Sequence, residues 1–203
     1  GIFYNITNSY DELTVEVTYE SDIDGIYNSY SGDVVIPATV TYDDKVYKVT
    51  SIGWYAFRNC NNLTSIVLPE GVTSIDGEAF SSCSSLASIN IPASMTEIRY
   101  AFNGCSSLTE IHIASIESWL KIRYEGEEAH PNAYASNVKL YIDGEELTEV
   151  EVPSSVISIP SQAFRNCSSL TSITLPEGVT SIGNYAFNSC SSLTSITIPE
   201  SVT

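Results

Sequence analysis

The side chains in this sequence best suited to bind a metal ion or to take part in catalysis are those of five cysteines and two histidines. The cysteines recur at a nearly fixed spacing, as Cys60, Cys83, Cys105, Cys167 and Cys190. A zinc site would need ligands clustered within one repeat, and the sequence has no C-x-x-C pair. The spacing instead predicts one small buried side chain per structural repeat, stacked into a ladder. Disulfides between neighbouring repeats stay open as an alternative, although an odd number of cysteines cannot pair completely.

The histidines and carboxylates form no recognisable catalytic motif. His112 takes an outward position in a predicted strand, and His130 precedes a proline in a predicted loop. The sequence has no H-E-x-x-H, G-x-S-x-G, Walker or G-x-G-x-x-G pattern. DIDG at 22–25 resembles the start of a calcium loop, but Ile26 stands where an EF-hand needs an oxygen ligand, so we reject it. We therefore predict no enzymatic activity, no metal site and no cofactor.

The cysteine spacing marks an internal repeat that covers most of the chain. Copies that begin at residues 60 and 167 read CNNLTSIVLPEGVTSIDGEAFSS and CSSLTSITLPEGVTSIGNYAFNS. A period of about 23 residues with an L-x-x-L-x-L core is the signature of a leucine-rich-repeat solenoid. Since one such coil cannot bury enough apolar surface to offset the chain entropy of folding, the coils must stack on one another.

The apolar letters within one copy predict the parts of a coil. L-x-x-I-x-I alternates, so a short strand points these side chains inward, and the proline that follows ends the strand. V-T-S-I alternates again and predicts a second short strand on the opposite flank. A-F-x-x-C predicts a turn of helix that buries phenylalanine. We expect a right-handed β/α superhelix of about seven coils, with a parallel sheet on its concave face.

The N-terminal region departs from the repeat. Residues 1–30 alternate strongly and predict a β-hairpin that caps the edge of the solenoid, which we assign to residues 31–203. The stretch 33–57 predicts one more coil with a small inserted hairpin, TYDDKVYK, whose turn lies at Asp43 and Asp44.

A longer interruption separates the middle and last copies, at residues 114–146. SIESWLKI has helical spacing, an acidic loop follows at 125–128, and VKLYIDGEEL predicts a hairpin with an Asp-Gly turn. We expect the sheet to continue through Leu140–Ile142 and the rest to bulge outward. Trp119 is predicted to pack in the core; the alternative is that the insertion is a recognition feature, because loops inserted into solenoids often lie on the binding face.

Charge limits the class of partner. Asp and Glu number 25 against 8 Lys and Arg, which gives a net charge of −17 and excludes nucleic acid as an expected partner. Apolar runs are too short for a transmembrane helix, so no direct membrane insertion is expected. Because the chain begins at Gly1 and stops inside a repeat, we expect that an export signal has been removed and that further sequence follows. We expect a monomer, with end-to-end contacts possible through the uncapped last coil.

The repeat copies, such as CSSLTSITIPESVT at 190–203, resemble the BspA-type (Treponema-pallidum-type) leucine-rich repeats of bacterial surface proteins. The resemblance covers nearly the whole chain, and the opening segment and the interruption resemble proteins of gut Bacteroidetes. It implies an exported, cell-surface module that takes part in adhesion to proteins or glycans of a host or of neighbouring cells. A structural spacer that presents a downstream domain is the alternative.

The side chains that point outward from the predicted strands form the candidate binding surface. Most of these side chains are small, whereas the larger and charged ones gather in the middle coils. We therefore expect an acidic partner-binding patch on the concave face, formed by Glu110, His112, Tyr141, Glu149 and Glu151. A solvated polar face with no partner is the alternative reading.

Overall fold

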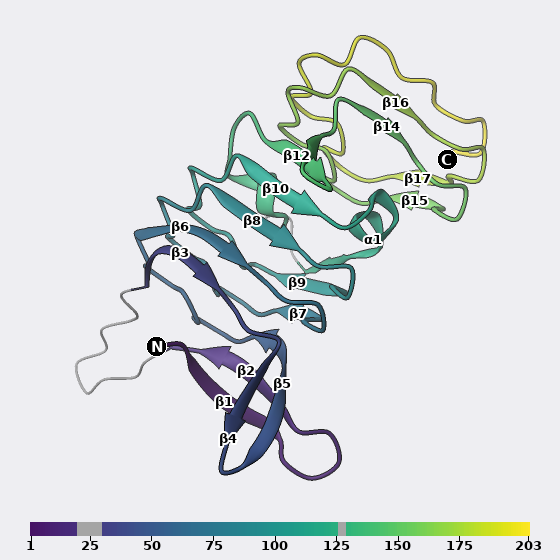
Figure 1. Ribbon diagram of the computed structural model, residues 1–203. Coiled ribbons are helices and arrows are strands. Elements are labelled where there is room, and N and C mark those ends of the chain that lie inside the picture. Colours follow the sequence, from purple (N-terminus) through teal and green to yellow (C-terminus); the bar gives the residue numbers. More distant parts are fainter. Residues whose placement is uncertain (20–29, 126–128) are drawn as a thin grey trace.

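The computed structural model describes residues 1–19, 30–125 and 129–203, and within these ranges the chain winds into a solenoid (Figure 1). The DIDG segment at 22–25 and most of the predicted acidic loop at 125–128 therefore lie outside the described residues. Coils stack from the N-terminal strands at one end to the last repeats at the other (Figure 1). The predicted repeat solenoid is confirmed.

The first strands of the coils up to the insertion form one sheet, in which neighbouring coils pair in parallel. Buried isoleucines stack across the coils, because Ile66 pairs with Ile89 and Ile89 pairs with Ile111. The sheet runs in the spatial order β13-β12-β10-β8-β6-β3. Its strands are β3 (Ser31–Val35), β6 (Asn62–Val67), β8 (Ser88–Ile91), β10 (Glu110–Ile113), β12 (Lys139–Ile142) and β13 (Glu145–Glu146).

The predicted second strand on the opposite flank is also found, and it forms a second sheet. Short parallel strands run from β5 through β7 and β9 to β11. They align Ile52, Ile75 and Ile98 in the core, and Tyr124 of β11 takes the next position in this row. The N-terminal strands β1 and β2 continue this sheet, since β2 pairs in parallel with β5. Its members are β1 (Phe3–Asn8), β2 (Thr14–Thr18), β4 (Thr39–Tyr42), β5 (Lys45–Ile52), β7 (Ser74–Ile75), β9 (Glu97–Arg99) and β11 (Arg123–Glu125).

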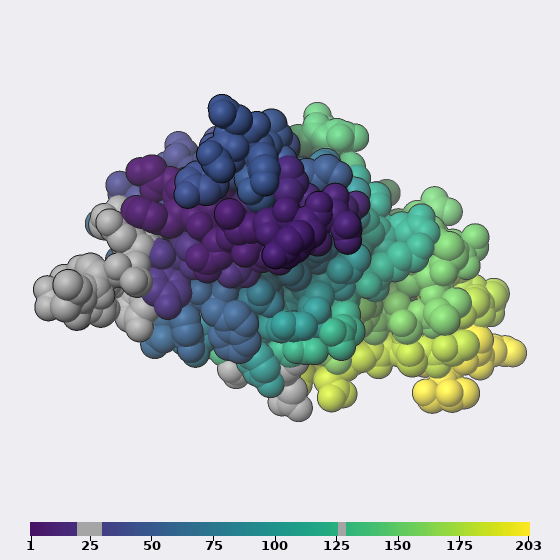
Figure 2. All heavy atoms as spheres, turned by 90° about the horizontal axis from the view of Figure 1, so that it is seen from below, coloured from purple at the N-terminus to yellow at the C-terminus, as the bar shows by residue number. Residues whose placement is uncertain are grey.

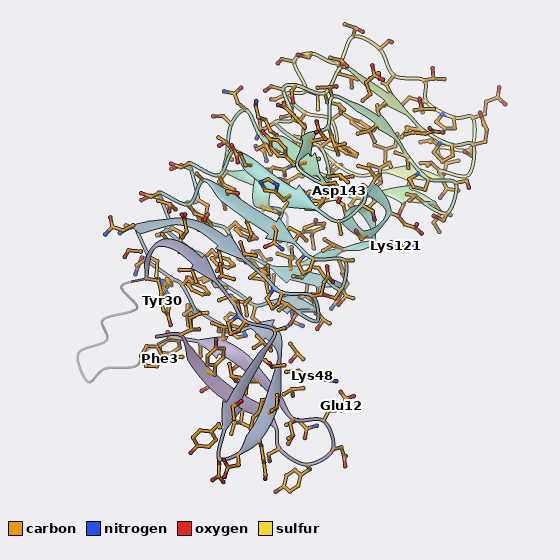
Figure 3. All side chains as sticks on the ribbon, viewed as in Figure 1. Phe3, Glu12, Tyr30, Lys48, Lys121 and Asp143 are labelled. Atoms are coloured by element: carbon orange, nitrogen blue, oxygen red, sulfur yellow. The ribbon has the colours of Figure 1, made fainter. Side chains whose placement is uncertain are left out.

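Two antiparallel hairpins gather at the N-terminal end of the stack. One joins β1 to β2, and the other joins β4 to β5 through Asp43 and Asp44, which both have positive φ. The hairpin predicted within TYDDKVYK is therefore confirmed. Figure 2 shows both hairpins lying over the end of the coils, and Figure 3 places Phe3 beside Tyr30, whose hydroxyl accepts a hydrogen bond from the Phe3 amide.

The segment that closes each coil is a hydrogen-bonded turn, where we expected a turn of helix. The amide of Ser81 donates to the carbonyl of Glu78, while the amide of Phe57 donates to Ala79 in the next coil. The residues on either side of this turn take left-handed conformations, as at Glu78 and Ser82, so an α-helix cannot propagate through it. The turn still buries its phenylalanine, and the Phe57 and Phe80 rings stack 5.2 Å apart.

The insertion begins with the predicted helix, α1 (Ile116–Lys121), whose first turn is capped by Ser115. A short 3₁₀ helix, η1 (Pro131–Ala133), follows before β12. The sheet continues through Leu140–Ile142 as predicted, but β12 then folds back onto β13 and the sheet ends there. The last coils form separate pairs, β14 (Glu149–Glu151) with β16 (Ser172–Thr174) and β15 (Ser158–Ile159) with β17 (Ser181–Ile182).

Candidate functional site

The structure brings three of the five predicted patch residues together. β10 and β12 pair in parallel, so His112 lies opposite Tyr141 and Glu110 lies opposite Lys139. The His112 and Tyr141 rings stack 4.8 Å apart, and His112 Nε2 lies 3.8 Å from a Glu110 oxygen. The side chains of Glu110 and His112 are 48% and 40% exposed, which leaves both accessible to a partner.

Glu149 and Glu151 do not join that cluster through the sheet. Both are exposed on β14, whose strand partner in the described part of the chain is β16. The fold-back of β13 onto β12 ends the first sheet before β14, so the predicted patch is divided between two sheets. Figure 3 labels Asp143 at the turn of this intervening hairpin, where Asp143 and Gly144 both have positive φ.

The cluster around His112 is also less acidic than predicted. Lys139 lies beside Glu110 in the register, and its ammonium group is 2.9 Å from Glu146. The hydrogen bond from Lys139 lowers the pKa of Glu146. A partner at this surface would therefore meet both signs of charge around a stacked aromatic pair.

Strand register extends this cluster into an outward-facing row. Val35 pairs with Val67 at one end, and Asn90 pairs with His112 at the other. Asn90 reaches the adjacent strand, since its side chain exchanges hydrogen bonds with the backbone of Leu68. The two valines are 65% and 44% exposed. We call Val35, Val67, Asn90, His112 and Tyr141 the outward row.

All five cysteines are buried, with free thiols, at the same position of successive coils. The thiols of Cys83, Cys105 and Cys190 each donate to a phenylalanine carbonyl of the preceding coil, at 2.9 to 3.1 Å. Burial raises the pKa of Cys105 to about 12, so this thiol stays protonated at neutral pH. These contacts are those of a packing position.

A hollow of about 360 Å³ lies at the other edge of the coils, where the insertion meets the turns of the coils that follow it. Neither strand alternation nor motifs in the sequence indicated this site. The turns contribute side chains that immediately precede Ala-Phe in the repeat, and the insertion contributes Tyr124 and His130. We call this the insertion hollow, lined by Tyr124, His130, Pro160, Ser161, Gln162, Asn184 and Tyr185.

His130, which the sequence placed in a loop, is buried among aromatic rings. The Tyr124 ring stacks on it at 4.3 Å, and Trp119 meets it edge-on at 4.7 Å. Trp119 is itself buried, and its Nε1 donates to the carbonyl of Ala163, as its predicted core position requires. Burial lowers the pKa of His130 to about 3, so the imidazole is neutral at physiological pH.

A second, smaller hollow of about 240 Å³ forms at corresponding repeat positions nearer the N-terminus. Trp54 lies across Gly77, where a β-carbon would come within 2.4 Å of the indole, and Tyr100 and Tyr134 complete the aromatic lining. Glu78 also lines it and forms an ion pair with Arg58 at 3.2 Å. The turn edge of the coils is therefore richer in aromatic side chains than the first sheet.

Charged side chains on the second sheet pair with one another. Arg99 contacts Asp76 at 3.2 Å and Glu97 at 2.9 Å, and Arg123 joins Glu97 from the next strand. Burial would raise the pKa of Glu97, but the hydrogen bond from Arg99 lowers it. This network cross-links adjacent coils. Among the residues that the structure describes, no group of three His, Cys, Asp or Glu side chains is placed to hold a metal ion, and no helix could cross a membrane.

Comparisons with known proteins agree with this architecture. The family model of the BspA type leucine rich repeat region matches residues 37–126 and 137–203, in six copies. A leucine-rich repeat protein from Bacteroides ovatus is 32% identical, with a TM-score of 0.64, over 100% of this chain and 47% of that one. The chain therefore spans about half the length of that protein.

Two further solved structures share the fold. The leucine rich repeat protein of T. pallidum is 26% identical, with a TM-score of 0.56, over 95% of this chain and 87% of that one. A leucine-rich repeat protein from Bacteroides capillosus is 27% identical, with a TM-score of 0.51, over 70% of this chain and 94% of that one. Among curated proteins, no match is found.

Proposed function

The chain belongs to the BspA-type leucine-rich repeat family, and from this premise we propose that it is a protein-interaction module displayed on a bacterial cell surface. The observation that carries the proposal is the outward row on the first sheet. Strand pairing holds its side chains in a fixed register, so a partner meets a surface that needs no ordering on binding.

The composition of the outward row suits a protein partner. Two half-exposed valines and a stacked His-Tyr pair give apolar and aromatic contact area, while Glu110 and Lys139 provide charges beside it. Protein interfaces combine an apolar, aromatic centre with a polar rim, and tyrosine is common among the side chains that dominate binding energy. Adhesion to a host or to a neighbouring cell is the specific role that we propose for this surface.

The test is a binding screen with matched variants. The chain is immobilised at physiological salt and screened against extracellular-matrix proteins and mucins. We expect the triple variant Val67→Ser, His112→Ser and Tyr141→Ser to lose at least about tenfold in affinity for any partner found, equal to about 1.4 kcal/mol. Glu149→Ser with Glu151→Ser is the control, because these exposed residues lie on a different sheet.

The outcomes separate the proposal from its alternatives. Equal binding by the wild-type chain and the triple variant would remove the outward row as the site. Loss of binding in the Glu149 and Glu151 double variant alone would move the site to β14 and the last coils. If no partner binds the wild-type chain at all, a structural spacer becomes the better account.

A further inference from the structure

The insertion hollow carries an inference that does not depend on the proposed surface interaction. Its lining side chains come from two parts of the chain that are distant in sequence. Tyr124 and His130 belong to the insertion, whereas Ser161, Gln162, Asn184 and Tyr185 belong to turns of the later coils. Its volume of about 360 Å³ falls within the range of small-molecule sites in proteins.

None of the described side chains that line the hollow carries a charge at neutral pH, although the Arg165 guanidinium lies 5.7 Å from the Tyr185 ring centroid and donates to Gln162. Ser161, Asn184 and Tyr185 are exposed and form a rim, while His130 and Gln162 are buried beneath them. Gln162 Oε1 accepts a hydrogen bond from Arg165 at 3.1 Å, and its amide nitrogen has no partner in the described chain. The hollow thus offers neutral donors and acceptors beside two phenol rings.

Several polar atoms at this place are buried without a hydrogen bond. They are the Tyr124 hydroxyl and both ring nitrogens of His130, none of which makes a hydrogen bond of normal geometry to a described residue. The Asn132 side chain lies beside His130 and opposes the lowering of its pKa. A buried polar atom without a partner costs free energy, so folded proteins rarely retain one. Phenylalanine would fill either position with a ring and without this cost. The retention of both polar side chains therefore indicates a partner from outside the chain.

We propose that the insertion hollow binds one small, uncharged, hydroxyl-rich molecule, namely a single sugar unit. A neutral imidazole and a phenol can each donate and accept, as hydroxyl groups require. The Tyr124 and Tyr185 rings line the hollow and supply apolar area for the carbon face of the sugar, on the sides not covered by His130 and Arg165. Among the described lining residues an ionic ligand would meet no opposite charge, and the neighbouring Arg165 is already engaged by Gln162 and the Tyr185 ring. Tyr124 and His130 take up hydroxyl groups of the bound sugar after a small adjustment of their side chains.

The test uses variants that keep the ring and delete the polar atom. Wild type, Tyr124→Phe and His130→Phe are titrated with glucose, galactose, mannose and N-acetylglucosamine up to about 50 mM, so that weak binding still shifts the melting temperature. Ligand-observed saturation-transfer NMR detects the same binding directly. Tyr42→Phe is the matched control, because Tyr42 is exposed on the β4–β5 hairpin.

We expect at least one sugar to bind the wild-type chain and the Tyr42→Phe control equally. Tyr124→Phe and His130→Phe should each weaken that binding by about tenfold while melting, without sugar, at or above the wild-type temperature. Failure of all four sugars to bind the wild-type chain would overturn the proposal and leave water as the occupant. Equal binding by wild type and both variants would overturn it too. If His130→Phe does not fold, Tyr124→Phe decides the question.

Discussion

The buried thiols of the cysteine ladder find partners inside the coils, whereas several buried polar atoms of the insertion do not. The thiols of Cys83, Cys105 and Cys190 donate to carbonyls of the coil before them, so each copy of the repeat supplies a partner for the next. His130 and Asn132 have no such partner, although both are buried. Most of the unsatisfied buried atoms among the described residues thus lie in the part of the chain that breaks the repeat, with Arg165 Nε in the coil that follows as an exception. A functional constraint is easiest to accommodate where the repeat is broken.

The buried imidazole predicts a specific loss of stability in acid. The pKa of His130 is about 3 in the folded chain, against 6.5 for an unperturbed histidine. Above pH 6.5 the imidazole is neutral in both the folded and the unfolded chain, so this group causes no loss of stability. As pH falls below 6.5 the unfolded state binds a proton first, so the free energy of unfolding falls until pH reaches about 3. At pH 4.5 the loss is on the order of 2–3 kcal/mol.

Denaturant unfolding of wild type and His130→Phe between pH 7.5 and 4.5 measures this effect. Carboxylates titrate over the same range in both proteins, so their contribution cancels in the difference. We expect the variant to lose less stability than wild type as the pH falls, beginning near pH 6.5. Parallel curves for the two proteins would show that His130 is not buried as a neutral ring.

At the scale of elements, the closing turns of two neighbouring coils approach each other closely at Gly183. Gly183 lies at the start of a turn, and a β-carbon there would come within 2.3 Å of the Ser161 amide nitrogen and 2.7 Å of its Cα. These are backbone atoms of the preceding coil, so they cannot move aside as the end of a side chain can. Gly178, in the same coil, has 3.8 Å to its nearest neighbour, the carbonyl oxygen of Ser154.

Alanine substitutions at these two glycines should therefore differ sharply. We expect Gly183→Ala to lower the free energy of unfolding by about 2–3 kcal/mol, because two coils must move apart. Gly178→Ala should change it by less than about 1 kcal/mol, since its φ is not left-handed and space is available. Urea unfolding of both variants provides the comparison, and equal losses would contradict close packing between the turns.

How far the sequence predicts these elements depends on whether they repeat. Alternating letters predicted both strands of each coil, and helical spacing predicted α1 around Trp119. The closing turns were mistaken for helix, because the left-handed residues that prevent it, such as Glu78, are not glycines. The Asp-Gly turn predicted the hairpin of β12 and β13, and this hairpin is confirmed. The sheet was nevertheless expected to reach Glu149 and Glu151, and the sequence did not show that the hairpin would end it. Tyr124 continues the inward row of Ile75 and Ile98 in the second sheet, but the insertion's sequence does not match the repeat and so did not show this. His130 lies outside any periodic pattern, so its burial follows from tertiary packing alone.

At the scale of the whole molecule, the insertion joins two runs of coils whose sheets are separate. Strand pairing ends at β13 and resumes at β14, so the connection depends on side chains and on a backbone hydrogen bond from the Val138 amide to the Asn166 carbonyl. Trp119 Nε1 donates to Ala163, and Asn166 Nδ2 donates to the carbonyls of Asn132 and Ala135 at 3.0 and 2.7 Å. A stacked repeat unfolds as one unit only where neighbouring coils are strongly coupled. Cooperativity across the insertion therefore depends on a few such bonds.

Asn166 offers a test of that dependence, because the repeat contains its own control. Asn59 occupies the same position of an earlier coil, with φ of 62° against 61°, and its side chain makes no hydrogen bond in the described part of the chain. Asparagine tolerates a left-handed backbone better than alanine does, so both alanine variants lose some stability for this shared reason. Asn166→Ala also leaves two carbonyls without their donor, so it should cost about 2–3 kcal/mol more than Asn59→Ala.

The expected consequence is a change in the number of unfolding transitions. In a Trp54→Phe background, Trp119 is the remaining tryptophan. Its fluorescence reports on the contact between the insertion and the coils that follow it, which we call the join. Asn166→Ala should shift the fluorescence transition to lower urea concentration than the transition in circular dichroism, because the last coils separate first. Asn59→Ala should keep the two transitions coincident, since it leaves every bond across the join in place. Coincident transitions in both variants would mean that apolar packing around Trp119 couples the two runs of coils without Asn166.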